Sequence, residues 1–153
     1  MIAETTTRVQ QHTAPFLNER IINKTRENIN RYAAHPEGIE DRLKQLDQEW
    51  DIERMLEANA SSLVIIGVIL GTLVWLWFYL VSFLVGTFLL QHAIQGWCPP
   101  IRLFRRLGFR THSEIATEHY ALRLLRGDFN DLAGLSRGDA KARAEKAFHL
   151  AKW

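Results

Sequence analysis

The middle of the chain is a long apolar stretch between two amphipathic arms. Residues 58–101 contain no Asp, Glu, Lys or Arg, and residues 63–90 are almost entirely Leu, Val, Ile, Phe, Trp and Gly. As one straight helix this stretch would be about 66 Å long, at ~1.5 Å per residue, whereas a bilayer's hydrocarbon core is only ~30 Å thick. Two segments, near 59–76 and 79–97, each fit one crossing. The pattern therefore predicts a two-helix transmembrane hairpin.

The reversal between the two segments lacks ordinary turn chemistry. Residues 73–81 include no Gly, Pro, Asn or Asp, which are the residues that usually build turns. A shallow re-entrant hairpin therefore stays open as an alternative. Aromatic and basic residues favour membrane interfaces. The expected interfacial anchors are Trp75, Trp77 and Tyr79 at the tip, and Trp50, Trp97, Arg102, Arg105 and Arg106 toward the other end.

Small residues recur at helical spacing on both segments. Gly67 and Gly71 are four apart on the first, and Ser82 and Gly86 are four apart on the second. Small residues let membrane helices approach closely. We expect these four to pack the hairpin against itself, or else to form a face for another copy or another subunit.

The N-terminal arm, residues 1–57, has two amphipathic helical patterns. The first begins near Pro15 and is broken at Pro36. The second repeats apolar residues at i, i+4, i+7 and i+11 and is expected to lead directly into the membrane. The apolar residues of this second pattern are Ile39, Leu43, Leu46 and Trp50.

The C-terminal side has clear stop and start signals. Two prolines after Cys98 end the second crossing, and a short basic amphipathic helix is expected over residues 101–107, stopped by Gly108. Thr111 and Glu114 form a capping-box pair for a helix that runs to about residue 126. A last basic helix is expected over residues 139–153.

These patterns predict an all-α membrane protein in four parts. The parts are an N-terminal helical arm (1–57), the transmembrane hairpin (58–98), a C-terminal amphipathic arm (99–129) and a basic tail helix (130–153). Residues 102–153 carry 11 basic and 6 acidic groups. Because positive charge favours the cytoplasmic side, we expect a multi-pass protein with both termini in the cytoplasm.

Candidate chemistry is sparse. Cys98 is the one cysteine, and nearby arginines would lower the pKa of its thiol, but a lone cysteine at an interface is more often a small apolar residue or an acylation site. His92 is the one histidine inside the apolar stretch and is a candidate ligand for haem or pigment, with hydrogen bonding to a neighbouring helix or water as the plainer interpretation. Without recognisable metal-ligand spacing or a catalytic constellation, we expect no metal site, no cofactor and no enzymatic activity.

The segment Gln95-Gly96-Trp97-Cys98-Pro99-Pro100, followed by Arg105-Arg106-Leu107-Gly108, resembles the YgaP-like transmembrane-domain family of bacterial inner-membrane proteins. The likeness would span roughly residues 15–129 and leaves residues 130–153 outside it. It implies a two-helix membrane unit in the bacterial inner membrane. Some members carry a rhodanese sulfurtransferase domain, which is not present here, so a rhodanese cysteine's catalytic role does not carry over to Cys98.

The leading hypothesis is a non-catalytic scaffold or accessory subunit that binds partner proteins, or copies of itself, through its amphipathic arms and small-residue faces. A membrane-edge thiol protein acting through Cys98, and haem or pigment binding through His92, are the alternatives. Transport is less favoured because two crossings enclose no pathway. Anionic lipid is an expected contact of the basic tail, whereas nucleic acid is not expected, since acidic residues interleave with the basic ones.

Overall fold

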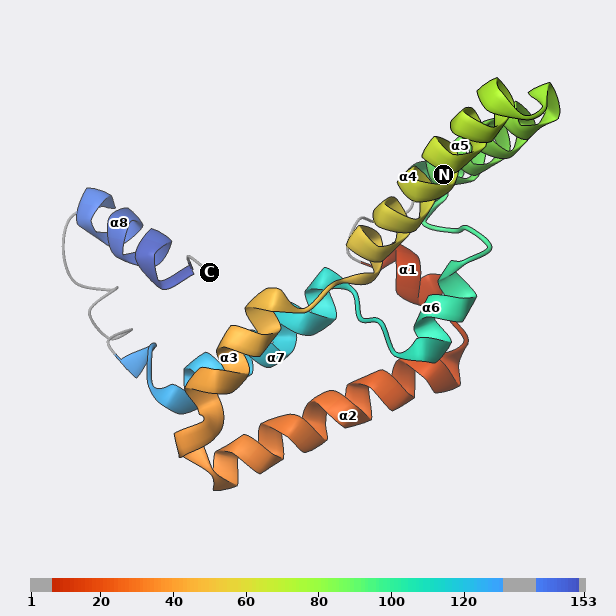
Figure 1. The fold of residues 1–153 in the computed structure, drawn as a ribbon. Helices are drawn as coiled ribbons and strands as arrows, with labels where there is room; N and C mark the ends of the chain where they lie inside the picture. The colour runs from red at the N-terminus through yellow and green to blue at the C-terminus, as the bar shows by residue number, and fades with distance from the viewer. Residues whose placement is uncertain (1–6, 131–139, 152–153) are drawn as a thin grey trace.

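The computed structural model describes residues 7–130 and 140–151, and the regular elements in these ranges are all helices (Figure 1). In chain order they are α1 (Arg8–Gln11), α2 (Pro15–Ala34), the 3₁₀ turn η1 (Pro36–Gly38), α3 (Ile39–Gln48), α4 (Ile52–Leu73), the 3₁₀ turn η2 (Leu76–Phe78), α5 (Tyr79–Gln95), α6 (Ile101–Leu107), α7 (His112–Arg126) and α8 (Ala140–Ala151). The expected all-α class is confirmed.

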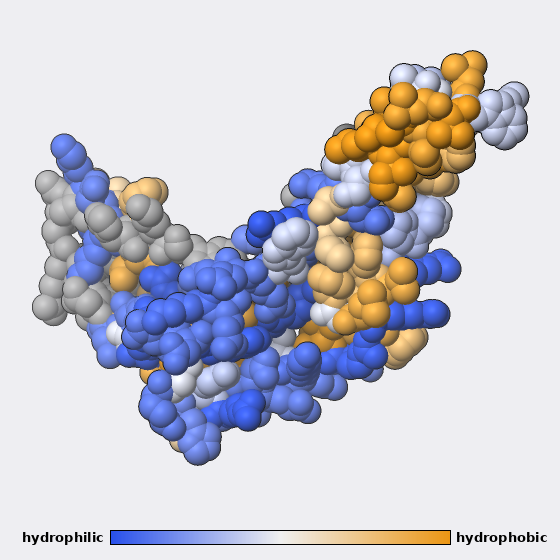
Figure 2. Space-filling model, viewed as in Figure 1, coloured by the Kyte–Doolittle hydropathy of each residue, from blue (hydrophilic) through white to orange (hydrophobic). Residues whose placement is uncertain are grey.

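Helices α4 and α5 run side by side and project away from the other helices (Figure 1). The structure contains two helices that are long and apolar enough to cross a membrane, within spans 36–73 and 76–95. Their large side chains lie on the outside, with Leu73 77%, Leu76 72% and Phe83 69% exposed, and Figure 2 shows this surface in orange. A continuous apolar surface of this kind is suited to lipid rather than water, which confirms the expectation of a membrane protein.

The hairpin reverses over residues 74–78 without a glycine or proline. The N–H groups of Val74 and Trp75 both donate to the Leu70 carbonyl, at 2.9 and 3.0 Å. Trp75 is extended (φ −159°, ψ 130°), and its carbonyl accepts from the N–H of Phe78 at 3.0 Å. Backbone hydrogen bonds to the end of α4 and across η2 thus replace the turn residues that the sequence lacks.

Gly71, one turn before the reversal, provides the space for it. The ring of Tyr79 lies against this glycine, so that a Cβ added there would meet ring carbons at 3.0 Å. The Tyr79 hydroxyl is 2.9 Å from the Thr72 hydroxyl oxygen. The tyrosine therefore closes the tip by packing on α4.

Of the other three small residues, Gly67 and Ser82 lie in the contact between α4 and α5, and Gly86 lies outside it. Ser82 on α5 donates to the Val64 carbonyl of α4 at 3.1 Å, and a Cβ on Gly67 would stand 2.4 Å from the Ser82 hydroxyl oxygen. Gly67 and Ser82 therefore lie where the two helices meet. A Cβ on Gly86, in contrast, would have open space around it, so Gly86 takes no part in the contact within the hairpin.

Two apolar clusters hold the polar part of the chain together. One lies between α3 and α7, with Tyr32 of α2 packed on it, and consists of Ile39, Leu43, Leu46, Ile115 and Leu122. The other lies where α4 and α5 meet the polar helices and consists of Val9, Ile52, Leu56, Cys98, Ile101 and Phe104. The arms on either side of the hairpin in sequence thus combine into one body, called here the polar unit (α1, α2, α3, α6 and α7).

The second N-terminal helix ends earlier than expected. Helix α3 stops at Gln48, and the side chain of Asp51 accepts the N–H of Arg54 at 2.8 Å as the N-cap of α4. Trp50 therefore lies in the linker, 43% exposed, with the Arg54 guanidinium 4.4 Å from its ring centre. The expected extension of this helix to Trp50 is wrong, because Asp51 caps the start of a new helix.

The expectation that the prolines after Cys98 end the second crossing is wrong, because α5 already ends at Gln95 with Gly96 (φ 74°) as its left-handed cap. The later C-terminal signals are confirmed. Helix α6 ends at Gly108 (φ 94°) and α7 ends at Gly127 (φ 92°), both in the left-handed region that suits glycine. The capping box of Thr111 and Glu114 is present. Helix α8 lies within the expected tail helix, whose residues 139, 152 and 153 fall outside the described residues.

Candidate functional site

The short helix α1 lies across the end of α5. A Cβ on Gly96 (φ 74°) would stand 2.5 Å from the Cβ of Arg8. The Arg8 guanidinium donates to the Glu53 carboxylate at 2.6 Å and to the Ala93 carbonyl at 3.2 Å, so one side chain links both hairpin helices. Sequence reasoning assigned no role to Arg8, because a helix of four residues is too short to show a periodic pattern.

His92 lies in α5 one turn before this crossing and is only 5% exposed. Neither of its ring nitrogens has a hydrogen-bond partner in the structure. Across residues 7–130 and 140–151, no group of three or more His, Cys, Asp and Glu side chains is placed to hold a metal ion. His92 therefore does not belong to a metal-binding cluster of this size in the described part of the chain.

Cys98 is buried, 3% exposed, in the cluster with Val9 and Ile52. Burial raises the pKa of its thiol, and a backbone hydrogen bond from Ile101 opposes this only partly. The expectation that neighbouring arginines lower this pKa is wrong, since desolvation dominates. A buried thiol with a raised pKa is a poor nucleophile.

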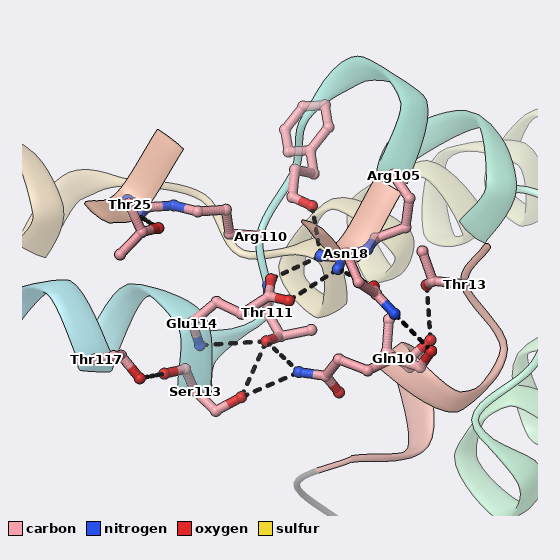
Figure 3. A network of polar contacts seen from close by, with 12 residues as sticks. Gln10, Thr13, Asn18, Thr25, Arg105, Arg110, Thr111, Ser113, Glu114 and Thr117 are labelled. Atoms are coloured by element: carbon pink, nitrogen blue, oxygen red, sulfur yellow. Dashed lines mark hydrogen bonds and ion pairs between the residues drawn. The ribbon is translucent and has the colours of Figure 1, made fainter. Parts of the chain in front are cut away.

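Arg105 points into the polar unit rather than toward lipid (Figure 3). It is fully buried and binds both carboxylate oxygens of Glu114, at 2.7 and 2.8 Å. It also donates to the Asn18 side chain at 2.8 Å and to the Phe109 carbonyl at 3.1 Å. Its expected role as an interfacial anchor is therefore wrong, because Glu114 and Asn18 give it an internal partner set.

A second buried arginine, Arg110, joins α7 to the N-terminal helices. It binds both carboxylate oxygens of Glu49 at 2.7 and 2.6 Å, and it also pairs with Glu118. Glu118 is fully buried and accepts from Arg42 at 2.8 Å and Asn28 at 3.2 Å. Every ionised group here has an opposite charge, which is the condition for stable burial.

This network is bonded directly to the hairpin. The Arg110 carbonyl accepts the N–H of Ile52, the first residue of α4, at 2.8 Å. The side-chain amide of Gln10 donates to the Thr111 hydroxyl at 3.1 Å (Figure 3). The start of α4, the start of α7 and α1 are therefore held at one place, which fixes the direction of the hairpin relative to the polar unit.

The remaining expected anchors are at the surface. Trp75 and Trp77 are 63% and 62% exposed at the tip, where their rings meet edge to face at 6.4 Å. Trp97 is half-buried, and Arg102 and Arg106 are exposed on α6.

Two cavities border α6. The larger, about 610 Å³, is lined by α2, the end of α6 and the linkers before α4 and α7. It has five basic residues, but Arg42 and Arg110 are already paired with Glu49 and Glu118. The smaller, about 400 Å³, lies between the start of α2, α6 and the end of α5.

Part of the chain, from the start of α4 to the start of α7, is similar to a known family of membrane domains. Residues 51–114 match the family model described as inner membrane protein YgaP-like, transmembrane domain. No curated protein and no solved structure matches the chain. The match confirms the resemblance, although over a shorter range than residues 15–129: it runs from the N-cap of α4 through the hairpin and α6 to the capping box of α7. The family match and the two apolar helices together support an inner-membrane location.

Proposed function

We propose that this chain is a non-catalytic scaffold or accessory subunit of the bacterial inner membrane, which holds its polar unit at a fixed position on the bilayer and binds partner proteins or further copies of itself. The observation that carries the proposal is the attachment of α4, α7 and α1 to one another where the hairpin begins. A partner bound to the polar unit is thereby held at a constant distance and angle from the membrane.

The state of the ionisable groups supports a non-catalytic role. Catalytic acids, bases and nucleophiles need access to substrate and a pKa suited to their task. Here the partly buried carboxylate of Glu114 and the fully buried carboxylate of Glu118 are bound to arginines, and the Cys98 thiol is buried. The two carboxylates form internal ion pairs and the thiol packs in an apolar cluster, so we assign these groups a structural role.

Two surfaces are suited to partners. The face of α5 that carries Gly86 has room for a closely packed helix, which small residues favour in membranes. In the polar unit, α7 leaves the side chains of Leu124 and Leu125 59% and 45% exposed beside Tyr120. Exposed apolar groups of this kind are common where proteins associate.

The proposal includes a two-crossing topology with both termini in the cytoplasm. The basic residues that flank the hairpin, Arg102 and Arg106 after it and Arg54 before it, favour that orientation, and the tip carries none.

Affinity isolation tests the proposal. Two differently tagged copies of the full chain are expressed together at native level, and each tag is isolated from gently solubilised membranes. We expect the second tag, or a constant set of other membrane proteins, to co-purify. A monomeric, partner-free species would contradict the proposal.

A pair of variants locates the membrane contact. Gly86→Ile fills the open face of α5, and Ser61→Ile adds a similar side chain at an exposed small residue of α4. If copies meet at Gly86, the first variant reduces co-purification of the second tag and the control does not.

A further inference from the structure

The charged residues that line the smaller cavity, about 400 Å³, are all basic. Its lining includes Arg102 and Arg106 of α6, His12 and Phe16 near the start of α2, and Trp97 just after α5. Among residues 7–130 and 140–151, no Asp or Glu lines it. The cavity is therefore electrostatically suited to an anion.

The two arginines are available to a ligand. They are four residues apart on α6, and both are exposed. In the described part of the chain neither forms an ion pair, whereas Arg105 between them is buried and bound to Glu114. Guanidinium groups match phosphate oxygens in shape and charge, so two unpaired arginines at one cavity favour a phosphate.

The cavity also lies at the level of the membrane surface. It opens directly after the charge-free helix α5, beside the interfacial residue Trp97. Helix α6 carries two exposed leucines next to the arginines, Leu103 at 56% and Leu107 at 66%. In Figure 2 an orange area lies below the hairpin where Figure 1 places α6, with blue atoms beside it. Such a helix rests in the headgroup region with its apolar side toward the acyl chains.

The start of α2 adds to the positive potential. This helix has 20 residues, no acidic residue in its first turn and no side-chain cap. Its positive dipole end is thus uncompensated beside the cavity.

We propose that this cavity binds the headgroup phosphate of an anionic phospholipid, such as phosphatidylglycerol. Arg102 and Arg106 bind the phosphate oxygens, while Phe16, Trp97 and the leucines of α6 contact the glycerol and the upper acyl chains. The lipid is the favoured source of the phosphate because the cavity is lined by Trp97, two residues after the charge-free helix α5, and by Phe16, and because α6 carries exposed leucines. This inference is independent of any protein partner.

Binding is measured on the purified full chain in detergent, titrated with short-chain phosphatidylglycerol, short-chain phosphatidylethanolamine or inorganic phosphate. The test variant is Arg102→Ala/Arg106→Ala. The matched control is Arg26→Ala/Arg31→Ala, which removes two exposed arginines of α2 that line neither α6 cavity. We expect phosphatidylglycerol to bind the natural chain and the control equally, and to bind the test variant about 30-fold more weakly.

Three outcomes would overturn the proposal. Equal affinity for the two phospholipids would show that the negative charge is not recognised. Unchanged affinity in the test variant would remove the arginines from the site. Inorganic phosphate that binds as tightly as phosphatidylglycerol would identify a free anion site instead. Near-ultraviolet circular dichroism of the test variant establishes that it is folded, as expected for two exposed side chains.

Discussion

The fully buried carboxylate of Glu118 is bound by three side chains, those of Arg42, Arg110 and Asn28. Replacing Glu118 with Gln leaves Arg42 and Arg110 to share the carboxylate of Glu49, and breaking a buried pair in this way costs about 3–5 kcal/mol. We expect Glu118→Gln to lower the free energy of unfolding of the polar unit by about that amount. Chemical unfolding of the full chain in detergent, followed by tryptophan fluorescence, measures it.

The control for this prediction is an exposed pair. Lys44 lies 3.4 Å from Glu40 with both side chains mostly exposed, and exposed pairs contribute only about 0–1 kcal/mol. Lys44→Ala should therefore change stability little. Equal effects of the two substitutions would contradict the assigned role of Glu118.

The carboxylates of Glu118 and Asp128 should make the free energy of unfolding depend on pH in the acid range. Burial would raise the pKa of Glu118, but Arg42 and Arg110 outweigh it and hold this pKa below the ordinary value of 4.5. Hydrogen bonds from Arg126 lower the pKa of Asp128 from 3.8 to about 2. A carboxyl with a lower pKa in the folded state contributes stability at higher pH and loses it as pH falls through the folded pKa. We expect stability to fall between about pH 4.5 and 2, and Asp128→Asn to remove part of that fall.

At Cys98 the prediction concerns reactivity. Because the thiol is buried and its pKa is raised, iodoacetamide at pH 7.5 should modify the native protein much more slowly than the unfolded protein. A cysteine at exposed position 40, introduced as Glu40→Cys with Cys98→Ala, provides the control for a free thiol. Comparable rates at the two positions in the native protein would restore the thiol hypothesis.

At the scale of the helices, two glycines of the hairpin should respond in opposite ways to the same methyl group. In Gly67→Ala the new Cβ overlaps the Ser82 hydroxyl, and overpacking of this kind costs about 1–3 kcal/mol. In Gly86→Ala the Cβ enters open space, and alanine favours the helix by about 0.5–1 kcal/mol. Thermal unfolding in detergent should show a lower midpoint for the first and an equal or higher one for the second.

The helices also show which features the sequence determines locally. The boundaries of α6 and α7 follow from Gly108, Gly127 and the capping box, whose geometry needs only neighbouring residues. The N-cap Asp51 is as local as these signals, but the apolar register that ends at Trp50 favoured a longer helix. The tip is closed by the ring of Tyr79, which packs against Gly71 of the preceding helix. The amino-acid composition of the turn does not reveal this contact.

The candidate site was less predictable than the helices, and its arginines show why. Arg102, Arg105 and Arg106 belong to one short basic run, and sequence treated them alike. The structure separates them because only position 105 meets Glu114 and Asn18. Asn18 precedes the hairpin in the sequence and Glu114 follows it. A local sequence pattern cannot predict that both contact Arg105.

For the whole molecule, the depth of the hairpin is the decisive property. A cysteine in place of Trp77, in a Cys98→Ala background, should react with a membrane-impermeant maleimide added outside intact spheroplasts. A cysteine at position 40 should react only after lysis. Protection of position 77 in intact spheroplasts would indicate a shallow re-entrant hairpin or the opposite orientation.

The pairing of Glu118 with Arg42 and Asn28 has a consequence for biosynthesis. The ribosome completes α2 and α3 first, then the hairpin, and only afterwards the residues that neutralise and cover them. While the hairpin is being made, the side chains of Arg42 and Asn28 on the N-terminal helices are therefore still exposed to water. In the order of synthesis the hairpin therefore comes before closure of the polar unit, and the buried ion pairs between its two halves form last.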